Sequence, residues 1–380
     1  MEVARAHNRP VECRRSGGHE RARAERLRFG QQQRQQRRQQ QRQRWLLGPG
    51  GGPSSGSIAC GKGSITGAGS TFQKNLELQW IKDYTGACSS SGVQYNGTGS
   101  GAGIQSFSDS QVDFAGSDSL LKETQQPKAD ARCGAGNKAV HIPVTGGAVV
   151  LTYNLPGVSD LKLSAPVLAG IFQGEIKNWN DPKIAADNGG TKLPSLPIQP
   201  VHRSDGSGTT DIFSKFLAAT AKSGWKLGTG QELKWPAGQA AKGSDGVTAA
   251  VKSSSGGITY TELSFAKANS LPFAQVKGAG DFVTASGDTV AAALSAAKVD
   301  DSKGDTRVKV DYATSQSGAY PVSAVSYVIV CDKGNKNADA LKAYLTYATG
   351  KGQASAPSLG YGKLPDAIAS KVTSAVSSIS

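Results

Sequence analysis

Short apolar runs alternate with amphipathic segments over residues 57–380 of this chain. Phe72, Leu76 and Trp80 recur at the spacing of one helix face, and the run 323–331 is typical of a buried strand. Such alternation predicts an α/β fold in which helices pack on both faces of mixed sheets. A length of 380 residues exceeds one ordinary core, so we expect two domains.

The expected strands are short apolar runs that end at turn residues, and they cover 93–95, 112–115, 138–142, 148–153, 257–260 and 323–331. The expected helices show a one-sided apolar pattern, and they cover 166–173, 207–219, 247–252 and 289–297, with further helices that begin near 72, 104, 338 and 367.

Residues 1–56 differ in composition from the rest of the chain. The first 50 residues hold 13 Arg, no Lys and four Glu, a net charge of +9, whereas the remainder carries +5. This Arg- and Gln-rich stretch cannot bury enough apolar surface to fold, so it is predicted to be a disordered extension, non-native to the protein. The alternative is a nucleic-acid-binding arm, because Arg runs neutralise phosphate backbones. The first interpretation is favoured, with no nucleic-acid partner.

No export signal or membrane span is recognisable in the sequence. The only apolar run within the extension is Trp45, Leu46 and Leu47, which is too short for a secretory signal. No segment approaches the roughly 20 apolar residues of a transmembrane helix. We therefore expect that the natural N-terminus differs from Met1 and that the true leader is missing.

The chain has five cysteines, Cys13 in the extension and Cys60, Cys88, Cys133 and Cys331 after it. The absence of any CxxC pair and the presence of only four His argue against a zinc site. Four widely spaced cysteines predict two disulfides and an oxidising compartment. Cys88–Cys133 with Cys60–Cys331 is the preferred pairing, because Cys60 and Cys331 border the first and last expected strands. Lipidation within the sequence SIAC is the alternative for Cys60.

Three turns rich in Gly, Ser and Thr stand directly before expected helices, at 67–71, 97–101 and 205–209. Gly lets the backbone approach a ligand, and the free N–H groups of a first helical turn point at it. The helix dipole adds a preference for negative charge. One such turn is explained by N-capping alone. Three in one chain predict a shared site for a compact oxyanion.

Two charged residues beside these turns sharpen the prediction. Arg203 stands four residues before Ser207, where its guanidinium could hold two oxygens of a tetrahedral anion. Asp205 could orient that guanidinium or form a surface salt link with it. Asp118 follows an expected strand, and its carboxylate suits an anion that carries a proton, as phosphate does and sulfate does not. The alternative for Asp118 is an ordinary strand-end cap.

Two enzyme classes compete with a binding protein and fare worse. The segment 97–102 imitates a dinucleotide-binding fingerprint, but the expected helix after it is short and the other turns would have no role. A serine hydrolase would need a nucleophile frame that neither Ser100 nor Ser207 has. His141 and His202 are the only histidines after residue 56. We therefore expect neither an enzyme nor a cofactor.

Eight stretches resemble, in order, the phosphate-binding subunit of the bacterial high-affinity phosphate ABC transporter, and they read ITGAGSTF, VQYNGTGSGAGIQSF, VDFAGSDSLL, LTYNLPGV, IFQGEIKNWNDPKIA, LPIQPVHRSDGSGTTDIFSKFL, GSDGVTAAVKSSSGGITYTELSFA and GYGKLPDAIASKV. The resemblance runs from about residue 65 to the C-terminus, and RSDGSGT followed by GSD is its most specific part. The four cysteines after residue 56 resemble those of actinobacterial members.

The resemblance implies a two-lobe clamshell, the type II periplasmic-binding-protein fold, with a mixed sheet flanked by helices in each lobe. Lobe 1 would comprise 57–147 and 320–380, and lobe 2 would comprise 148–319. It also implies an extracytoplasmic solute-binding protein that captures inorganic phosphate between the lobes and delivers it to the transporter's membrane permease. We expect a monomer on the periplasmic or extracellular face of the membrane, with a lipid anchor as one option.

The resemblance also implies a phosphate-binding set, which falls on Thr71, Phe72 through its backbone N–H, Ser100, Asp118, Arg203, Ser207, Gly208 and Thr209, with Asp205 in support. One departure is Gln73, where many members have Pro, at a helix start where little effect is expected. Binding of a different oxyanion, or phosphate sensing without transport, is the alternative function.

Overall fold

The structure is a computed structural model that describes residues 58–301 and 305–380. The extension predicted at 1–56, with Cys13, lies outside the described residues. An eight-stranded mixed sheet organises the described part, and its strands in sheet order are β2 (Ser91–Gly97), β1 (Gly63–Gly69), β3 (Phe114–Ser117), β13 (Ser323–Cys331), β4 (Ala139–Asn154), β8 (Gly257–Glu262), β6 (Gln199–Arg203) and β7 (Gln239–Ala241). Strand β1 runs parallel to β2 and β3, β13 runs antiparallel to β3 and β4, and β6 runs parallel to β7 and β8.

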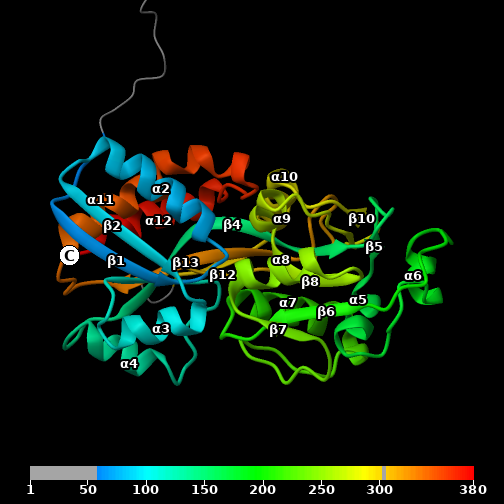
Figure 1. Cartoon of the computed structure of the whole chain (residues 1–380). Helices are drawn as coiled ribbons and strands as arrows, with labels where there is room; N and C mark the ends of the chain where they lie inside the picture. The colour runs from blue at the N-terminus through cyan, green and yellow to red at the C-terminus, as the bar shows by residue number, and fades with distance from the viewer. Residues whose placement is uncertain (1–57, 302–304) are drawn as a thin grey trace, which may run out of the picture. The chain divides into compact units, whose positions relative to one another are not determined.

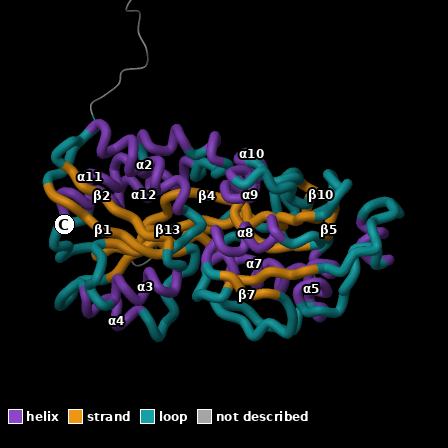
Figure 2. Tube along the Cα trace, viewed as in Figure 1, coloured by secondary structure: helices purple, strands orange, loops and turns teal. Residues whose placement is uncertain are grey.

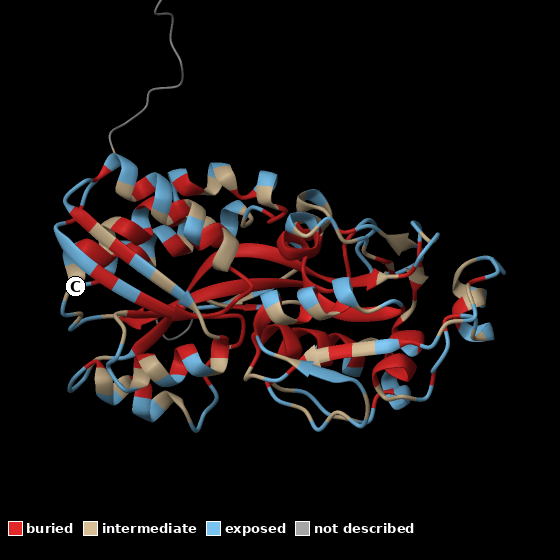
Figure 3. Ribbon diagram, viewed as in Figure 1, coloured by how far each residue is buried: buried red, intermediate tan, exposed pale blue. Residues whose placement is uncertain are grey.

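Strand β4 passes from one part of this sheet to the other. Residues 139–148 pair with β13, and residues 149–154 pair with β8. We call β1, β2, β3, β13 and residues 139–148, with the turns and helices that adjoin these strands, the β1 half, and β6, β7, β8 and residues 149–154, with the turns and helices that adjoin them, the β8 half. Both β4 and β13 are almost wholly buried, as the red strands at the centre of Figure 3 show.

The sequence predicted two strands, 138–142 and 148–153, where the structure has the single 16-residue strand β4. Gly146 and Gly147 fall in or beside the gap between the two predicted ranges, but both lie inside β4. A Cβ on Gly146 would stand 2.4 Å from Leu294 Cδ1, and one on Gly147 would stand 2.5 Å from Phe72 Cε1. The prediction of two separate strands was wrong, because the strand continues through these glycines, which make room for neighbouring side chains.

Helices cover both faces of the sheet, as the α/β prediction requires (Figure 2). Those around the β1 half are α2 (Lys74–Ala87), α3 (Ser100–Ser108), α4 (Gln126–Arg132), α11 (Ala338–Thr349) and α12 (Asp366–Ser378). Figure 1 shows α2, α11 and α12 on one face and α3 and α4 on the other. Those that pack around the β8 half are α5 (Ala165–Phe172), α7 (Gly208–Thr220), α8 (Gly243–Ser253) and α9 (Leu263–Ala268), whereas α10 (Gly287–Ser295) packs on β4 and β13.

The other elements are short, and they are α6 (Pro182–Asp187), β5 (Lys162–Leu163), β9 (Gln275–Lys277), β10 (Phe282–Val283), β11 (Lys298–Asp300), β12 (Arg307–Lys309), η1 (Lys222–Gly224), η2 (Lys351–Ser355) and η3 (Pro357–Leu359). The expected strand 323–331 is confirmed as β13. The apolar face expected near residue 72 is also confirmed, because Phe72, Leu76 and Trp80 are all fully buried. The helix expected from 104 begins earlier, at Ser100, directly after Gly99 with its φ of 94°.

Two disulfides are present, so their predicted number is confirmed, but the predicted pairing is wrong. Cys60 bonds Cys88, and Cys133 bonds Cys331. Cys60 and Cys88 each stand three residues before a strand, and these strands, β1 and β2, are parallel neighbours. Strand β3 lies between β1 and β13, which separates Cys60 from Cys331. A lipid on Cys60 would exclude its disulfide.

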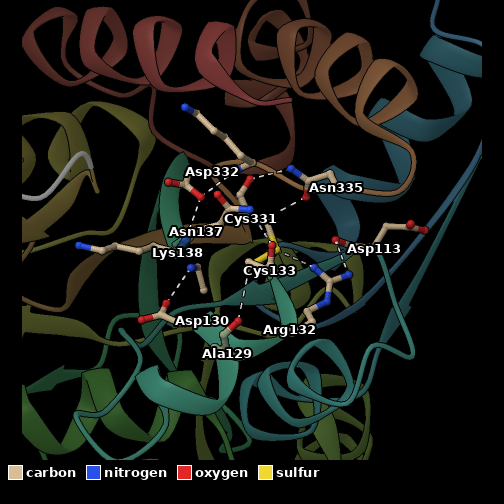
Figure 4. Close-up of a disulfide and its surroundings, with 12 residues drawn as sticks. Asp113, Ala129, Asp130, Arg132, Cys133, Asn137, Lys138, Cys331, Asp332 and Asn335 are labelled. Atoms are coloured by element: carbon tan, nitrogen blue, oxygen red, sulfur yellow. Dashed lines mark hydrogen bonds between the residues drawn. A yellow bond between two sulfur atoms is a disulfide. The ribbon is translucent and has the colours of Figure 1, made fainter. Parts of the chain in front are cut away.

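The second disulfide joins the end of α4 to the end of β13 (Figure 4). Cys331 pairs with Ala139 across the sheet, so the loop between α4 and β4 is tied down at both ends. Arg132 Nη2 donates to the Val112 carbonyl at 2.7 Å, and its Nη1 lies 3.2 Å from Cys331 Sγ. Within the described ranges, no helix combines the length and apolar character needed to cross a bilayer.

Candidate functional site

The three Gly-rich turns singled out in the sequence meet in the structure. The Gly99 N–H donates to the Gly69 carbonyl at 2.8 Å, and the Gly101 N–H donates to the Gly206 carbonyl at 2.9 Å. The first bond lies within the β1 half, and the second joins it to the β8 half. Helices α2, α3 and α7 therefore begin at one place, where their first-turn N–H groups can serve a single anion.

A fourth helix, α8, also begins here. The Gly243 N–H donates to Asp205 Oδ1 at 2.9 Å, and the Ser244 N–H donates to Thr71 Oγ1 at 3.4 Å. Ser244 Oγ lies 2.6 Å from Thr71 Oγ1, so this contact crosses between the halves. Lys74 Nζ reaches Asp245 Oδ2 at 2.8 Å beside it. The start of α8 thus positions candidate binding residues through its own hydrogen bonds.

Asp118 follows β3 as a buried carboxylate held by hydroxyl groups. Ser70 and Ser326 donate to its Oδ1 at 2.6 and 2.5 Å, and Ser100 donates to its Oδ2 at 3.2 Å. Burial raises the pKa of Asp118 to about 6, while these three hydrogen bonds lower it and the nearby charge of Glu262 raises it. The carboxylate is therefore stabilised by neutral donors and keeps its capacity to accept another proton donor.

Arg203 ends β6 and forms a two-point ion pair with Asp205. Its Nε lies 2.7 Å from Asp205 Oδ1, and its Nη2 lies 2.5 Å from Oδ2. The two side chains are only 2% and 11% exposed, so the pair is not a surface salt link. Burial acts to lower the pKa of Arg203, but the paired carboxylate outweighs it and the pKa is raised. The remaining nitrogen, Nη1, lies 3.4 Å from both Thr209 Oγ1 and Ser244 Oγ.

The start of α7 packs against the Asp118 carboxylate. Ser207 is the N-cap, and its Oγ accepts from the Thr210 N–H at 3.1 Å. A Cβ on Gly208 would stand 2.5 Å from Asp118 Oδ2 and 2.6 Å from Ser100 Oγ. Only glycine fits this close approach between the halves. The N–H groups of Gly208 and Thr209, in the first turn, have no carbonyl acceptor within their own helix.

The residues proposed from the sequence thus fall into two contacting groups. Ser100, Asp118 and Gly208 touch one another, while Arg203 stands close to Thr209 and, through Ser244, to Thr71. Phe72 follows Thr71 with its ring buried against Tyr361, whose hydroxyl donates to the Phe72 carbonyl at 2.6 Å. Ser207 flanks the second group, and Asp205 joins it through its ion pair with Arg203.

The two histidines have other partners. His141 Nδ1 lies 3.0 Å from Asp305 Oδ2, and its Nε2 accepts from the Leu121 N–H at 3.0 Å. The His202 ring stacks on Trp235 with centroids 5.2 Å apart. Neither ring is positioned beside the hydroxyl of a candidate nucleophile, so the geometry gives no support to the serine hydrolase alternative.

Comparisons with known proteins agree with this geometry. Residues 54–351 match the PBP superfamily domain. Phosphate-binding protein PstS 3 of Mycobacterium leprae is 38% identical over 335 residues, which cover 86% of this chain and 90% of that protein. Phosphate-binding protein PstS 2 of Mycobacterium tuberculosis strain H37Rv is 38% identical over 340 residues, covering 87% and 91%. The chain belongs to the PstS family.

The mycobacterial relatives agree with the actinobacterial character expected from the cysteines. A solved structure of a high-affinity periplasmic phosphate-binding protein (PfluDING), bound with phosphate, superposes with a TM-score of 0.66 at 24% identity. It covers 82% of this chain and 93% of that one. The superposition confirms the two-lobe periplasmic-binding-protein fold expected for a PstS family member.

Four residues of the site were not singled out in the sequence. Ser70 and Ser244 lie within quoted motifs, where their helix-start context was a signal that could have identified them. Ser326 lies in β13 and Glu262 ends β8, where each is a polar residue among buried strand positions. Each is one of several polar residues in its strand, and Glu262 also lies within a quoted stretch, but neither sign reveals what the side chain contacts.

Proposed function

We propose that this chain is an extracytoplasmic solute-binding protein that captures inorganic phosphate between its two halves and delivers it to a phosphate ABC transporter. The observation that carries the proposal is the contact between the Asp118 carboxylate and Gly208 at the start of α7. The helix start favours an anion, and the carboxylate demands that this anion donate a proton. Phosphate meets both conditions near neutral pH, and sulfate meets only the first.

The proposed phosphate-binding set is the one implied by the family resemblance, namely Thr71, the Phe72 N–H, Ser100, Asp118, Arg203, Ser207, Gly208 and Thr209. Asp205 would hold the Arg203 fork toward the anion, because it occupies two of the guanidinium's three nitrogens. The contacts among Ser100, Asp118 and Gly208 support the set, since they bring donors and the acceptor from both halves within reach of one ligand.

The halves correspond, in this proposal, to lobe 1 (57–147 with 320–380) and lobe 2 (148–319). Ser119 Oγ donates to Asp211 Oδ2 at 2.7 Å, which adds a further bond between them. Because the proposed donors come from both lobes, phosphate should favour the state in which the lobes are closed. Small-angle scattering should therefore show a smaller radius of gyration with phosphate than without it.

The protein acts by binding rather than catalysis, as a monomer whose partner is the membrane permease of the transporter. The relatives' names as phosphate-binding proteins support this role. Two disulfides suit the oxidising outer face of the cell membrane, periplasmic or extracellular. With Cys60 in a disulfide, surface attachment through that residue would need the bond to open, so we propose the disulfide as its state.

Equilibrium dialysis of the full chain with labelled phosphate tests the function. Unlabelled phosphate should displace the label, whereas sulfate and a dinucleotide should not at the same concentration. If sulfate displaced the labelled phosphate as readily as unlabelled phosphate does, the site would bind oxyanions in general and the proposed phosphate selectivity would be wrong. Binding of the dinucleotide by the chain would instead favour the dinucleotide-binding enzyme.

A further inference from the structure

Arg132 is a partly buried cation beside the disulfide between Cys133 and Cys331 (Figure 4). Its guanidinium lies over the Phe107 ring, with Cζ 3.9 Å from the ring centroid. Nη1 lies 3.2 Å from Cys331 Sγ, Nη2 donates to the Val112 carbonyl, and Nε has no hydrogen-bond partner among the described residues. Within the same ranges Arg132 forms no ion pair. Burial lowers the pKa of Arg132, so this position disfavours a charge that the sequence nevertheless places there.

The two sulfurs of this disulfide face groups of opposite character. Cys331 Sγ faces the Arg132 guanidinium, which can only donate. Cys133 Sγ lies 3.5 Å from the Ala129 carbonyl oxygen, which can only accept. A disulfide sulfur has neither a proton nor a charge, so it makes little use of either neighbour. After reduction, a Cys133 thiol could donate to Ala129 and a Cys331 thiolate could accept from Arg132. The surroundings therefore suit a reduced pair whose negative charge lies on Cys331.

The disulfide between Cys60 and Cys88 does not have this polarity. Cys60 Sγ lies 3.6 and 4.0 Å from the carbonyl oxygens of Ile58 and Ala87. Within the part of the chain that the structure describes, neither of its sulfurs is hydrogen-bonded to a cation. Carbonyl oxygens disfavour a thiolate, so this bond should be reduced to two ordinary thiols. The chain thus contains its own reference for the behaviour of Cys133 and Cys331.

We propose that Cys133–Cys331 is a redox-reactive disulfide, in which Arg132 stabilises Cys331 as the leaving thiolate when a dithiol attacks Cys133. The first thiolate of the reductant bonds to Cys133 Sγ, and the electron pair of the broken S–S bond stays on Cys331. The second thiolate then attacks the reductant's own sulfur in the mixed disulfide and expels Cys133. The dithiol is oxidised to a disulfide, and the cysteine pair gains two electrons. One thiol proton passes to Cys133, and the other goes to solvent.

The backbone at both cysteines is held by bonds other than the disulfide. Cys331 pairs with Ala139 in the sheet, and its carbonyl accepts from Asn335 Nδ2 at 2.7 Å. The Cys133 carbonyl accepts from Asn137 Nδ2 at 2.9 Å. These bonds keep the two sulfurs near each other after reduction, so exchange with a disulfide oxidant can re-form the bond, with the Cys331 thiolate as the attacking group. Both cysteines are buried, so a dithiol reaches Cys133 when the end of α4 opens locally.

A thiolate at Cys331 has a pH signature that can be measured in the wild type. The full chain is equilibrated with mixtures of reduced and oxidised dithiothreitol between about pH 6 and about pH 8, quenched with acid and alkylated. Mass spectrometry then reads each cysteine on its own peptide, which also separates Cys13. Ordinary thiols titrate near pH 8.5, so the equilibrium constant for reduction of Cys60–Cys88 should hardly change. Because reduction of Cys133–Cys331 releases a proton, its constant should rise by as much as about ten-fold per pH unit. A constant for Cys133–Cys331 that stays as flat as that of Cys60–Cys88 would overturn the proposal.

The other charged groups near Cys331 do not imitate this signature. They are Asp113, Asp130, Lys138, Asp332, Lys333 and the C-terminal carboxylate of Ser380. Carboxylates and amines ordinarily titrate outside the range from about pH 6 to about pH 8. His141, two residues beyond Ala139 in β4, is of a type that titrates within it. Its protonation at the lower pH would stabilise a thiolate there, so it would oppose the expected rise.

Arg132→Met removes the charge and tests its role directly. At about pH 7.5 the equilibrium constant for reduction of Cys133–Cys331 should fall by about ten-fold or more, and its dependence on pH should disappear. An arginine that served packing alone would give the opposite sign, because a looser site lowers the effective concentration of the two thiols and makes the bond easier to reduce. An unchanged or larger constant in Arg132→Met would therefore refute the proposal.

Two further variants separate the contact from general charge. Lys138→Met is the matched control, since Lys138 is an exposed cation of the same region whose side chain points away from the sulfurs in Figure 4. It should leave both equilibrium constants unchanged. Arg132→Lys keeps the charge and should recover part of the pH dependence that Arg132→Met loses. A fall in Lys138→Met as large as that in Arg132→Met would show that the contact with Cys331 is not the cause. If Arg132→Met does not fold, the wild-type pH series still decides the proposal.

Discussion

The two halves of the site hold their charged groups in different ways. In the β1 half, three serine hydroxyls hold the Asp118 carboxylate, and no cation lies within hydrogen-bond distance of it among the described residues. In the β8 half, a carboxylate holds the Arg203 guanidinium with two hydrogen bonds. One charge is thus stabilised by neutral groups, and the other is neutralised by an ion pair.

This difference assigns a separate task to each half. Asp118 remains an uncompensated acceptor in a desolvated place, so it should reject any anion that has no proton to give. Arg203 donates strongly while Asp205 cancels much of its net charge, so it should strengthen the binding of any tetrahedral anion in the correct orientation. We therefore expect the β1 half to control selectivity and the β8 half to control affinity.

Asp118→Asn should have the largest effect, and it should act on selectivity. The amide removes the repulsion toward sulfate and offers a donor, so sulfate binding should rise from undetectable while phosphate binding changes modestly. Sites that demand a particular hydrogen bond reject analogues by about 10⁴–10⁵. Calorimetric titration with both anions measures the ratio. A variant that still ignores sulfate and also loses phosphate would show that Asp118 is structural.

Arg203→Ala should weaken every anion together, by about 2–4 kcal/mol, because it strips charge-assisted donors and leaves Asp205 unpaired. Arg203→Lys is the matched control, since it keeps the charge but loses the planar fork, and it should fall between the wild type and Arg203→Ala. The same calorimetric series provides both values. If Arg203→Ala changed the sulfate-to-phosphate ratio as strongly as Asp118→Asn does, the division of tasks would be wrong.

Gly208→Ala should break the contact between the halves without weakening either of them. The new Cβ would lie 2.5 Å from Asp118 Oδ2 when the halves meet, and such overpacking costs about 1–3 kcal/mol. Alanine is a good helix former and the helix start does not require a positive φ here, so the melting temperature without phosphate should hold or rise. Phosphate affinity should fall by the cost of the clash. An unchanged affinity would mean that Asp118 and Gly208 need not meet for binding.

Patterns contained within one segment were predictable from the sequence. The spacing of Phe72, Leu76 and Trp80 identified a buried helix face, and the apolar run at 323–331 identified β13. The shared chemistry of the three turns predicted that they would serve one ligand, and the bond between Gly101 and Gly206 shows two of them in contact across the halves. Each of these inferences needed only local spacing and the properties of helix starts.

Features that depend on the order of strands in the sheet were not predictable. The disulfide partners are set by the order of the strands, in which β1 lies beside β2 and β13 lies beside β4. The spacing of the cysteines in the sequence does not predict this order. In the sequence, two successive glycines at 146 and 147 are typical of a turn. In the structure they lie in a strand and make room for Leu294 and Phe72. Glu262 carries no local sign of its bond to Thr209, because the two residues meet only after β8 and α7 pack together.

Glu77 is a second buried carboxylic acid in the β1 half, and its hydrogen bonds and pKa can be compared with those of Asp118. Glu77 lies in α2, and its Oε2 accepts from the Tyr344 hydroxyl at 2.5 Å. Its Oε1 has no hydrogen-bond partner among the described residues. Burial raises the pKa of Glu77 to about 7, and the hydrogen bond from Tyr344 opposes the shift. Asp118, with three donors, has its pKa raised only to about 6.

Glu77→Gln should have the smallest effect of the series on binding and should act on stability instead. A pKa raised in the folded state means that the folded protein holds the proton more tightly, so this contribution to stability is complete below the ordinary pKa of 4.5 and is lost as pH rises through about 7. An amide resembles the protonated acid. The free energy of unfolding of the variant should therefore equal that of the wild type near pH 5 and exceed it near pH 8 by about 1–3 kcal/mol.

Urea unfolding across this pH range measures the difference, with Glu123→Gln, at an exposed position, as the control. A stability difference between variant and wild type that does not change with pH would contradict this prediction. It would show that water or a rearranged partner satisfies Glu77 Oε1. The number of hydroxyl donors would then not explain why the pKa of Glu77 is raised further than that of Asp118.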